Sequence, residues 1–230
     1  MNLFAEHHHF WNEQRKKSLY LGILIILLSL VIQIGAGRYS SRVASSASYA
    51  GDLFLDNLPV VNLDFIIVAG ALIFWIGSFV LLAFRPRYLL FGLKAIALFV
   101  IFRAFFISLT HVGAYPREIS IGATNAGWSM YRLFTFQGNY FFSGHTGFPF
   151  LMALIFWREK WFRRFFLVLA FLFGISVLLA HVHYSIDVFA APFITYGVFV
   201  ITSRLFKRDY ALIAPPSHSL AMERSTTHGI

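Results

Sequence analysis

The sequence contains no cysteine, so disulfide bonds and thiolate metal sites are excluded, and the redox compartment cannot be read from it. Charge is also scarce, since only 13% of the 230 residues are charged while 58% are hydrophobic. A chain this apolar is not an ordinary soluble domain. Its composition is typical of a polytopic membrane protein.

Acidic residues are fewer than basic ones, 10 against 19, which gives a net charge of +9. Such an excess can indicate binding to nucleic acid. Here the basic residues lie in short clusters between long apolar runs, a pattern that fits topology signals and anionic lipid headgroups better than a groove for DNA. We therefore expect no nucleic-acid partner.

Six apolar runs approach or exceed the roughly 20 residues that a helix needs to cross a bilayer. Loops shorter than the membrane is thick join several of them. The sequence therefore predicts an all-α, polytopic membrane protein built as a six-helix transmembrane bundle. The runs are 19–34, 60–84, 89–109, 140–157, 165–180 and 186–206.

The runs divide the chain into three parts. Residues 19–208 are expected to form one transmembrane catalytic domain, between a cytoplasmic segment, 1–18, and a cytoplasmic tail, 209–230. The tail is polar and contains Pro215 and Pro216, so we expect it to be disordered. The N-terminal segment has no convincing small-residue cleavage site, so the first run is expected to be a retained span and not a signal peptide.

Basic clusters set the expected orientation, because cytoplasmic loops of membrane proteins carry an excess of Lys and Arg. When six spans are threaded, all the clusters fall on one side, which places both termini in the cytoplasm. Compact loops and the absence of cysteine favour a bacterial plasma membrane. The clusters comprise Arg15, Lys16, Lys17, Arg85, Arg87, Arg158, Lys160, Arg163, Arg164, Arg204, Lys207 and Arg208.

Ionisable residues stand at the non-cytoplasmic ends of the last three runs. His145 lies at the start of the fourth run, and His183 and Asp187 lie where the sixth run begins. Two short loops bring these ends together. Four residues apart on a helix, His183 and Asp187 would share one face, with about 6 Å between their Cβ atoms. The carboxylate then fixes the tautomer of His183 and leaves its other ring nitrogen as a nucleophile.

A second imidazole and several small polar groups complete the pattern. Phosphoryl transfer through a phosphohistidine requires one neutral histidine to attack phosphorus and one protonated histidine, here His145, to protonate the leaving alkoxide. Ser143, Thr146 and backbone N–H groups at a helix start can hold anionic oxygens. Gly144 permits close approach of the backbone.

The same residues have simpler explanations. A histidine at the end of a span is often only an interfacial residue, but a carboxylate inside a membrane helix is costly and is by default a functional candidate. We therefore favour a functional role for His145, His183 and Asp187 together. His181 lies off the face of His183, and the three histidines at 7–9 are better explained as a solvated patch than as a metal site. No metal or cofactor is expected.

Two motifs carry a resemblance to a known family. The Ser-Gly-His-Thr motif at 143–146, followed by His-Tyr-Ser-Ile-Asp-Val at 183–188, resembles the sphingomyelin synthase branch of the type 2 phosphatidic acid phosphatase superfamily. The resemblance covers most of the chain from 58 to 196. Weaker motifs of that branch match Leu58, Pro59, Asp64, Arg103, Thr110 and Tyr196.

The resemblance implies six membrane helices, an exoplasmic active site and no obligatory metal. It implies that His183 is the nucleophile, Asp187 its partner and His145 the acid–base. In that branch a phosphocholine or phosphoethanolamine headgroup passes from a membrane phospholipid to the primary hydroxyl of a lipid alcohol, ceramide, and diacylglycerol is released. Candidate substrate-binding residues are Ser143, Gly144, Thr146, Arg103, Tyr184 and Asn139.

The sequence also departs from the branch. Where the branch has Cys-Gly-Asp ahead of Ser-Gly-His-Thr, this chain has Gln137, Gly138 and Asn139. The missing carboxylate is a candidate base or a partner for a cationic headgroup, so headgroup preference and acceptor both stay open. The wider superfamily's Lys-x6-Arg-Pro and Ser-Arg motifs are absent, so a plain lipid phosphate phosphatase fits less well.

Three further charged residues have two interpretations each. Arg103, inside the third run, needs a partner, which is either a substrate phosphate or else Asp187 or a backbone carbonyl. Glu118 and Arg132 belong to the long outer loop, where a solvated surface charge is the simpler explanation and framing of the headgroup the alternative. Aromatic residues crowd the same loop, and a ring face there can hold a quaternary ammonium.

Three functions remain after the sequence is read. The first is a lipid phosphotransferase with a phosphohistidine at His183. The second is a phosphatase or phospholipase C-like hydrolase that uses the same His/His/Asp site, with water in place of the lipid alcohol. The third is a non-catalytic lipid-binding or transport protein. The sequence favours the first, and it leaves the oligomeric state open.

Overall fold

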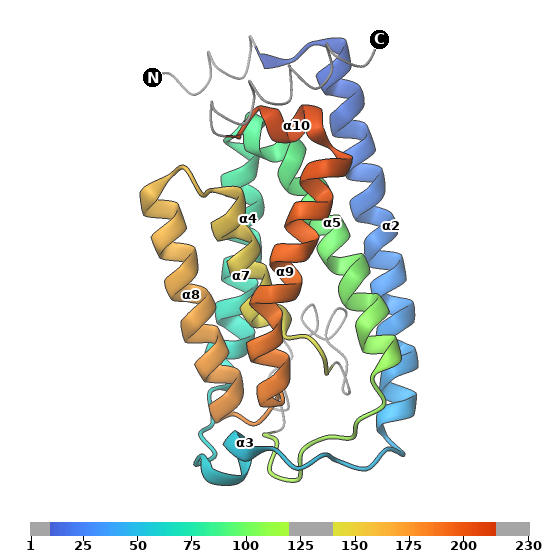
Figure 1. Cartoon of the computed structure of the whole chain (residues 1–230), viewed down its shortest axis with the longest axis vertical. Helices are drawn as coiled ribbons and strands as arrows, with labels where there is room; N and C mark the ends of the chain where they lie inside the picture. The colour runs from blue at the N-terminus through green and yellow to red at the C-terminus, as the bar shows by residue number, and fades with distance from the viewer. Residues whose placement is uncertain (1–9, 120–139, 215–230) are drawn as a thin grey trace.

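The computed structural model describes residues 10–119 and 140–214, and in these ranges the chain is helical with no strand. This confirms the predicted all-α class for the part of the chain described. The elements in order are α2 (Glu13–Ala44), α3 (Leu53–Asn57), the π-helix η1 (Ile66–Gly70), α4 (Ala71–Ala83), α5 (Pro86–Leu109), α7 (Gly144–Ile155), α8 (Lys160–Leu179), α9 (Ser185–Leu205) and α10 (Lys207–Ala211) (Figure 1).

Five helical segments in the described residues are long and apolar enough to cross a membrane. They are α2, α5, α8, α9 and the continuous segment Ile66–Ala83, which η1 and α4 form together. They fit a multi-pass membrane protein. The sixth apolar run, expected over 140–157, is helical only over Gly144–Ile155 and is too short to count as a sixth span by the same standard.

The short helix α7 begins and ends for local reasons. Ser143 has an extended backbone and caps the first turn, since its hydroxyl accepts from the N–H of Thr146. The helix stops before Phe156, whose backbone has left the helical conformation. The four residues ahead of α7 therefore cannot join the helix, although the sequence alone extends the apolar run through them.

Helix α2 is longer than the expected span of 19–34. Asn12 caps it by accepting from the N–H of Arg15, so the helix starts six residues earlier. Beyond the apolar run it continues to Ala44, with Gln33 and Ser40 buried rather than facing out. The helix thus tolerates polar residues because they lie on its inner face, against α5.

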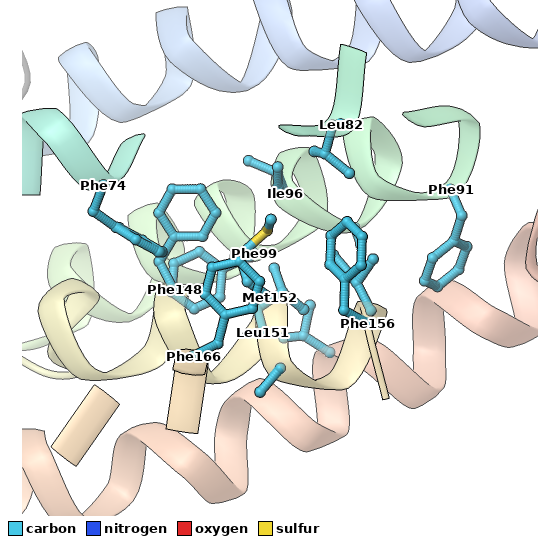
Figure 2. Packing of buried hydrophobic residues seen from close by; sticks show 14 of the residues in the cluster. Phe74, Leu82, Phe91, Ile96, Phe99, Phe148, Leu151, Met152, Phe156 and Phe166 are labelled. Atoms are coloured by element: carbon cyan, nitrogen blue, oxygen red, sulfur yellow. The ribbon is translucent and has the colours of Figure 1, made fainter. Parts of the chain in front are cut away.

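The core is built from phenylalanine rings around α7, which lies inside the bundle against α5, α8 and α9 (Figures 1 and 2). Phe148 of α7 meets the edge of Phe74, with ring centroids 5.2 Å apart. Phe99 of α5 contacts the other side of Phe148 at 6.1 Å. These ring contacts bury most of α7. They hold the helix in a fixed position, and with it His145 in its first turn.

Related elements gather at the two ends of the bundle. The starts of α2, α5 and α8, the end of α9 and all of α10 lie toward one end of the bundle (Figure 1). Helix α3 and the start of α9 lie toward the other end, and α7 starts in that same half of the bundle (Figure 1). The basic clusters flank the helix ends of the first group. The positive-inside rule supports assigning that end to the cytoplasm, and the assignment stays a prediction.

The expectation of a disordered tail from residue 209 is wrong for 209–214. Asp209 lies in α10, where its Oδ2 is 2.6 Å from the Nζ of Lys94 in α5. Ile213 and Ala214 are buried against the bundle. A buried counter-charge at Lys94, which the polar appearance of the tail does not reveal, draws this segment back onto the protein. Residues 215–230 lie outside the described part.

Candidate active site

The turn between α8 and α9 places His183. Helix α8 ends in a Schellman motif, in which the N–H of His181 bonds the carbonyl of Leu178 and the N–H of Val182 bonds that of Val177. His181 occupies the position that usually holds glycine, with φ of 57°. This left-handed backbone costs roughly 1–2 kcal/mol for a residue with a Cβ. Its ring is fully buried, 5.3 Å from that of Tyr115, which holds the turn in place.

Asp187 organises the first turn of α9. Its Oδ2 accepts the N–H of Tyr184 at 3.1 Å and lies 3.0 Å from Nδ1 of His183. A carboxylate can only accept here, so Nδ1 carries the proton and Nε2 presents a lone pair. Asp187 is 1% exposed, and the bond is therefore shielded from water.

The expected geometry of this pair was wrong in one respect, although the contact itself is present. His183 and Asp187 do not stack on one helix face, since α9 begins only at Ser185 and His183 precedes it. The spacing of four works because Asp187 is the third residue of the helix and turns back toward the residues ahead of it. The pair is thus part of a helix cap, not of a helix surface.

His145 comes to the same place from α7. Its ring centroid is 6.2 Å from that of His183, with 66° between the ring planes. A backbone bond joins the two helix starts directly, since the N–H of Ser143 donates to the carbonyl of Asp187 at 3.0 Å. Two protonated rings at this separation would repel each other, so the arrangement disfavours a charge on both imidazoles at once.

The π-helix orients His145. Nε2 of His145 lies 3.3 Å from the carbonyl oxygen of Ile67, the second residue of η1. A carbonyl only accepts, so Nε2 carries a proton in this contact. Such π-helical turns are frequent at functional sites. Neither η1 nor a partner for His145 in the second span was predicted from the sequence.

Arg103 reaches the start of α7 from α5. Its Nε donates to the carbonyl of Phe142 at 3.2 Å, which is the backbone-carbonyl partner considered from the sequence. A Cβ placed on Gly144 would lie only 3.2 Å from the same Nε. Glycine at this position therefore lets the guanidinium pack directly against the first turn of α7.

The hydroxyls of Ser143 and Thr146, in the Ser-Gly-His-Thr motif, face the interior of the protein. Ser143 is fully buried, and its Oγ accepts from the N–H and from the hydroxyl of Thr146, both at 3.4 Å. Thr146 is 6% exposed. In this structure both residues cap the helix, and their predicted contact with substrate stays a prediction.

A cavity of about 250 Å³ lies beside the pair. Asp187 lines it, and neither His145 nor His183 is among its described lining residues. Tyr184 also lines it, but the Tyr184 hydroxyl is engaged by the protein, donating to the carbonyl of Gly113 at 2.8 Å and accepting from the N–H of Ala50 at 3.2 Å. The Tyr184 hydroxyl is therefore already hydrogen-bonded within the protein.

Glu118 is partly buried and is hydrogen-bonded to a side chain of the cavity wall. Its Oε2 accepts the hydroxyl of Tyr140 at 2.7 Å, and Tyr140 lines the cavity. Burial raises the pKa of Glu118 to about 7, against a weaker lowering by the Tyr140 hydrogen bond. Asn139 and Arg132, which the sequence also singled out, lie outside the described residues.

Asp52 is a further candidate that reasoning from the sequence missed. Its carboxylate caps α3 and also accepts the N–H of Ser185, the first residue of α9, at 2.6 Å. An acidic residue directly before an apolar run is a recognisable helix-cap signal. The partner 133 residues away is not visible from the sequence. In the described ranges, no three His, Cys, Asp or Glu side chains gather in a way that could hold a metal ion.

One comparison with known proteins gives a match, and the matched residues include the candidate site. A family model described as PAP2 superfamily C-terminal matches residues 138–204. The matched stretch contains His145, His183 and Asp187, and the match supports the PAP2 superfamily without reaching the sphingomyelin synthase branch. No curated protein matches the chain. Together with the apolar helices, the match suggests a membrane-embedded enzyme of lipid phosphatase or phosphotransferase type.

Proposed function

We propose that this protein is a membrane lipid phosphotransferase that moves a phospholipid headgroup to a lipid alcohol through a phosphohistidine at His183. The observation that carries the proposal is the 3.0 Å contact between His183 Nδ1 and Asp187 Oδ2, with the ring of His145 6.2 Å from that of His183. It is supported by the match to the PAP2 superfamily.

The first half-reaction uses the lone pair that Asp187 exposes on His183. Nε2 attacks phosphorus, the bond from phosphorus to the diacylglycerol oxygen breaks, and His145 gives its proton to that oxygen. The carbonyl of Ile67 accepts from His145 Nε2 and so holds the ring in a fixed orientation. Arg103, packed on Gly144, supplies positive charge to the phosphoryl oxygens.

The second half-reaction restores the enzyme. The acceptor hydroxyl, such as the primary hydroxyl of ceramide, gives its proton to His145 and attacks phosphorus. The bond between phosphorus and Nε2 of His183 breaks, which leaves His183 neutral and His145 protonated. No metal ion or other cofactor is needed for either step in this scheme.

The lining of the cavity beside Asp187 supports a donor with a cationic headgroup. Carboxylates of Asp52 and Asp187 and aromatic rings of Tyr140, Phe141 and Tyr184 contribute to it, with no Lys, Arg or His among the described lining residues. Acidic and aromatic groups attract an ammonium or trimethylammonium group. This favours phosphocholine or phosphoethanolamine donors over a phosphate monoester that carries no cation.

The test is a donor and acceptor screen with the purified protein in micelles. Phosphatidylcholine or phosphatidylethanolamine, offered with ceramide or another lipid alcohol, should give the new phospholipid and diacylglycerol in equal amounts, identified by mass spectrometry. Equal product from wild type and His183→Ala would contradict the proposal. Asp187→Asn should lose most of the activity while folding normally.

Hydrolysis is the second candidate, because the family match supports a phosphatase as well as a phosphotransferase. The first half-reaction is the same, and water then replaces the lipid alcohol. Release of free phosphocholine, phosphoethanolamine or phosphate without any acceptor, undiminished when the acceptor is added, would favour it. Binding of lipid without any turnover would leave only a non-catalytic role. The expected setting of all three is a multi-pass membrane protein with the site on the non-cytoplasmic side.

A further inference from the structure

Asp52 joins two helix starts that are far apart in the sequence. Its Oδ2 accepts the N–H of Ser185 at 2.6 Å, while its Oδ1 accepts the N–H groups of Phe54 and Leu55 at 2.9 and 3.2 Å. The residue is 7% exposed. One carboxylate thus holds the start of α3 and the start of α9 in a fixed relation.

The Asp52 carboxylate is held in its charged form. Burial raises the pKa of Asp52, but hydrogen bonds from Ser185, Leu55 and Phe54 together outweigh it and leave the pKa below its usual value. A negative charge next to Ser185 also complements the positive end of the α9 helix dipole. The contact therefore persists at neutral pH, where the proposed reaction runs.

The first turn of α9 is where the catalytic pair is assembled. Ser185 is the first residue of the helix, and the carboxylate of Asp187, two residues on, orients His183. Any shift of the Ser185 backbone moves that carboxylate. We infer that Asp52 is a positioning residue for the His183–Asp187 pair, which acts through the N–H of Ser185. This inference rests on the proposed function.

A second set of hydrogen bonds holds the turn before α9, so the effect of Asp52 on orientation can be distinguished from an effect on stability. The hydroxyl of Tyr184 bridges Ala50 and Gly113, so the turn before α9 stays attached to its surroundings when the Asp52 contact is lost. We therefore expect loss of that contact to loosen the orientation of Asp187 while the bundle stays folded.

The sharpest variant is Ser185→Pro. Proline suits the first position of a helix, and it removes the N–H that Asp52 accepts together with the Ser185 hydroxyl. Tyr184, the residue before it, has φ −66° and ψ 154°, a conformation that a following proline permits. Asp52→Asn approaches the same contact from the other side. Ser185→Ala keeps the N–H and should lose far less activity than Ser185→Pro.

Three measurements test the positioning role of Asp52: the kinetic constants of the single variants, those of the double variant, and an NMR resonance. Ser185→Pro and Asp52→Asn should each lower kcat by about ten- to a hundredfold, since small misplacements of catalytic groups have effects of this size. Ser185→Pro should leave KM unchanged, whereas Asp52→Asn also raises KM for a cationic donor because Asp52 lines the cavity. The double variant should lose no more than the worse single one, because both delete the same contact.

The third readout does not depend on turnover. The low-field proton resonance of His183 Nδ1–H, observed by NMR in micelles, should weaken or shift in Ser185→Pro and persist in Asp56→Asn. Asp56 is the matched control, since its carboxylate lies in α3 and accepts from Tyr115 instead of α9. An intact resonance and wild-type kcat in Ser185→Pro, or additive losses in the double variant, would overturn the inference. Failure of wild type to turn over any donor would refute the proposed function, while the resonance would still decide the role of Asp52.

Discussion

The two ends of the bundle both bury charge, but they satisfy it differently. At the α10 end, Lys94 Nζ lies 2.6 Å from Asp209 Oδ2, and the hydroxyl of Ser18 donates to the same carboxylate at 2.8 Å. At the α3 end, the carboxylates of Asp52 and Asp187 accept from backbone N–H groups and, for Asp187, from an imidazole.

This difference in how the buried charges are satisfied suggests that one end of the bundle serves stability and the other the proposed reaction. In an ion pair such as Lys94 and Asp209, each charge neutralises the other and no proton needs to move, so the pair contributes to stability only. A carboxylate held by N–H groups stays ionised without a full counter-charge. It can then orient a neutral histidine whose second nitrogen remains nucleophilic. The first end therefore fastens α2, α5 and α10 together, and the second holds the proposed site.

The largest expected effect comes from His183→Ala at the site end. Removing the nucleophile should lower kcat by about 10⁴-fold, since loss of one member of a catalytic unit has effects of this order. The melting temperature should change little, because only a few contacts are lost. Activity and thermal unfolding in detergent measure both. His111→Ala, an exposed histidine at the same end, is the control and should resemble wild type.

Lys94→Ala tests the opposite end. Removing the lysine leaves Asp209 buried without its counter-charge, which should cost about 3–5 kcal/mol of unfolding free energy. The kcat of the protein that remains folded should not change. Denaturant unfolding and activity per folded molecule check this, and Lys94→Met combined with Asp209→Leu should recover most of the stability. A kcat that falls in parallel with stability would show that the two ends are not separate.

Gly144→Ala should affect the site mildly. The added methyl would lie 3.2 Å from Nε of Arg103, so the guanidinium must move by a few tenths of an ångström. We expect kcat to fall by about three- to tenfold. Stability should hold, because alanine favours the helix by about 1 kcal/mol over glycine. Gly197→Ala, at an open position in α9, is the matched control for kinetics and melting.

Glu118→Gln should have the smallest effect, a change in melting temperature that depends on pH. Burial raises the pKa of Glu118 from its usual 4.5 to about 7 in the folded protein, so its contribution to stability is present at low pH and is lost as pH rises from about 4.5 to 7. The glutamine variant should therefore melt higher than wild type at pH 8 and like wild type at pH 5. Melting curves across this range test it, and an equal difference at both pH values would contradict it.

The features that depend on local sequence patterns could be predicted from the sequence. Apolar runs predicted the helices, and the clustered arginines and lysines predicted which helix ends share one side. The spacing of His183 and Asp187 predicted their contact, although not its geometry, since the two residues do not share a helix face. These properties follow from hydropathy, charge and short-range geometry, which a single sequence displays directly.

The rest depends on contacts between distant segments. The partner of Asp52 lies 133 residues away, and that of Lys94 lies 115 residues away. The carbonyl of Ile67 that orients His145 belongs to a π-helix, for which hydropathy has no signal. Helix α7 begins four residues after the start of the apolar run because Ser143 caps it there, and composition does not reveal this. No periodicity reveals such pairings.

The most direct test of the account is to trap the proposed covalent intermediate. Wild-type protein mixed rapidly with a phosphatidylcholine or phosphatidylethanolamine donor, without acceptor, and kept at alkaline pH should gain the mass of one headgroup phosphoryl unit, which fragmentation assigns to His183. The adduct should be absent from His183→Ala and should disappear when a lipid alcohol is added. Product formation with no adduct on His183, or with the adduct on another residue, would contradict the account.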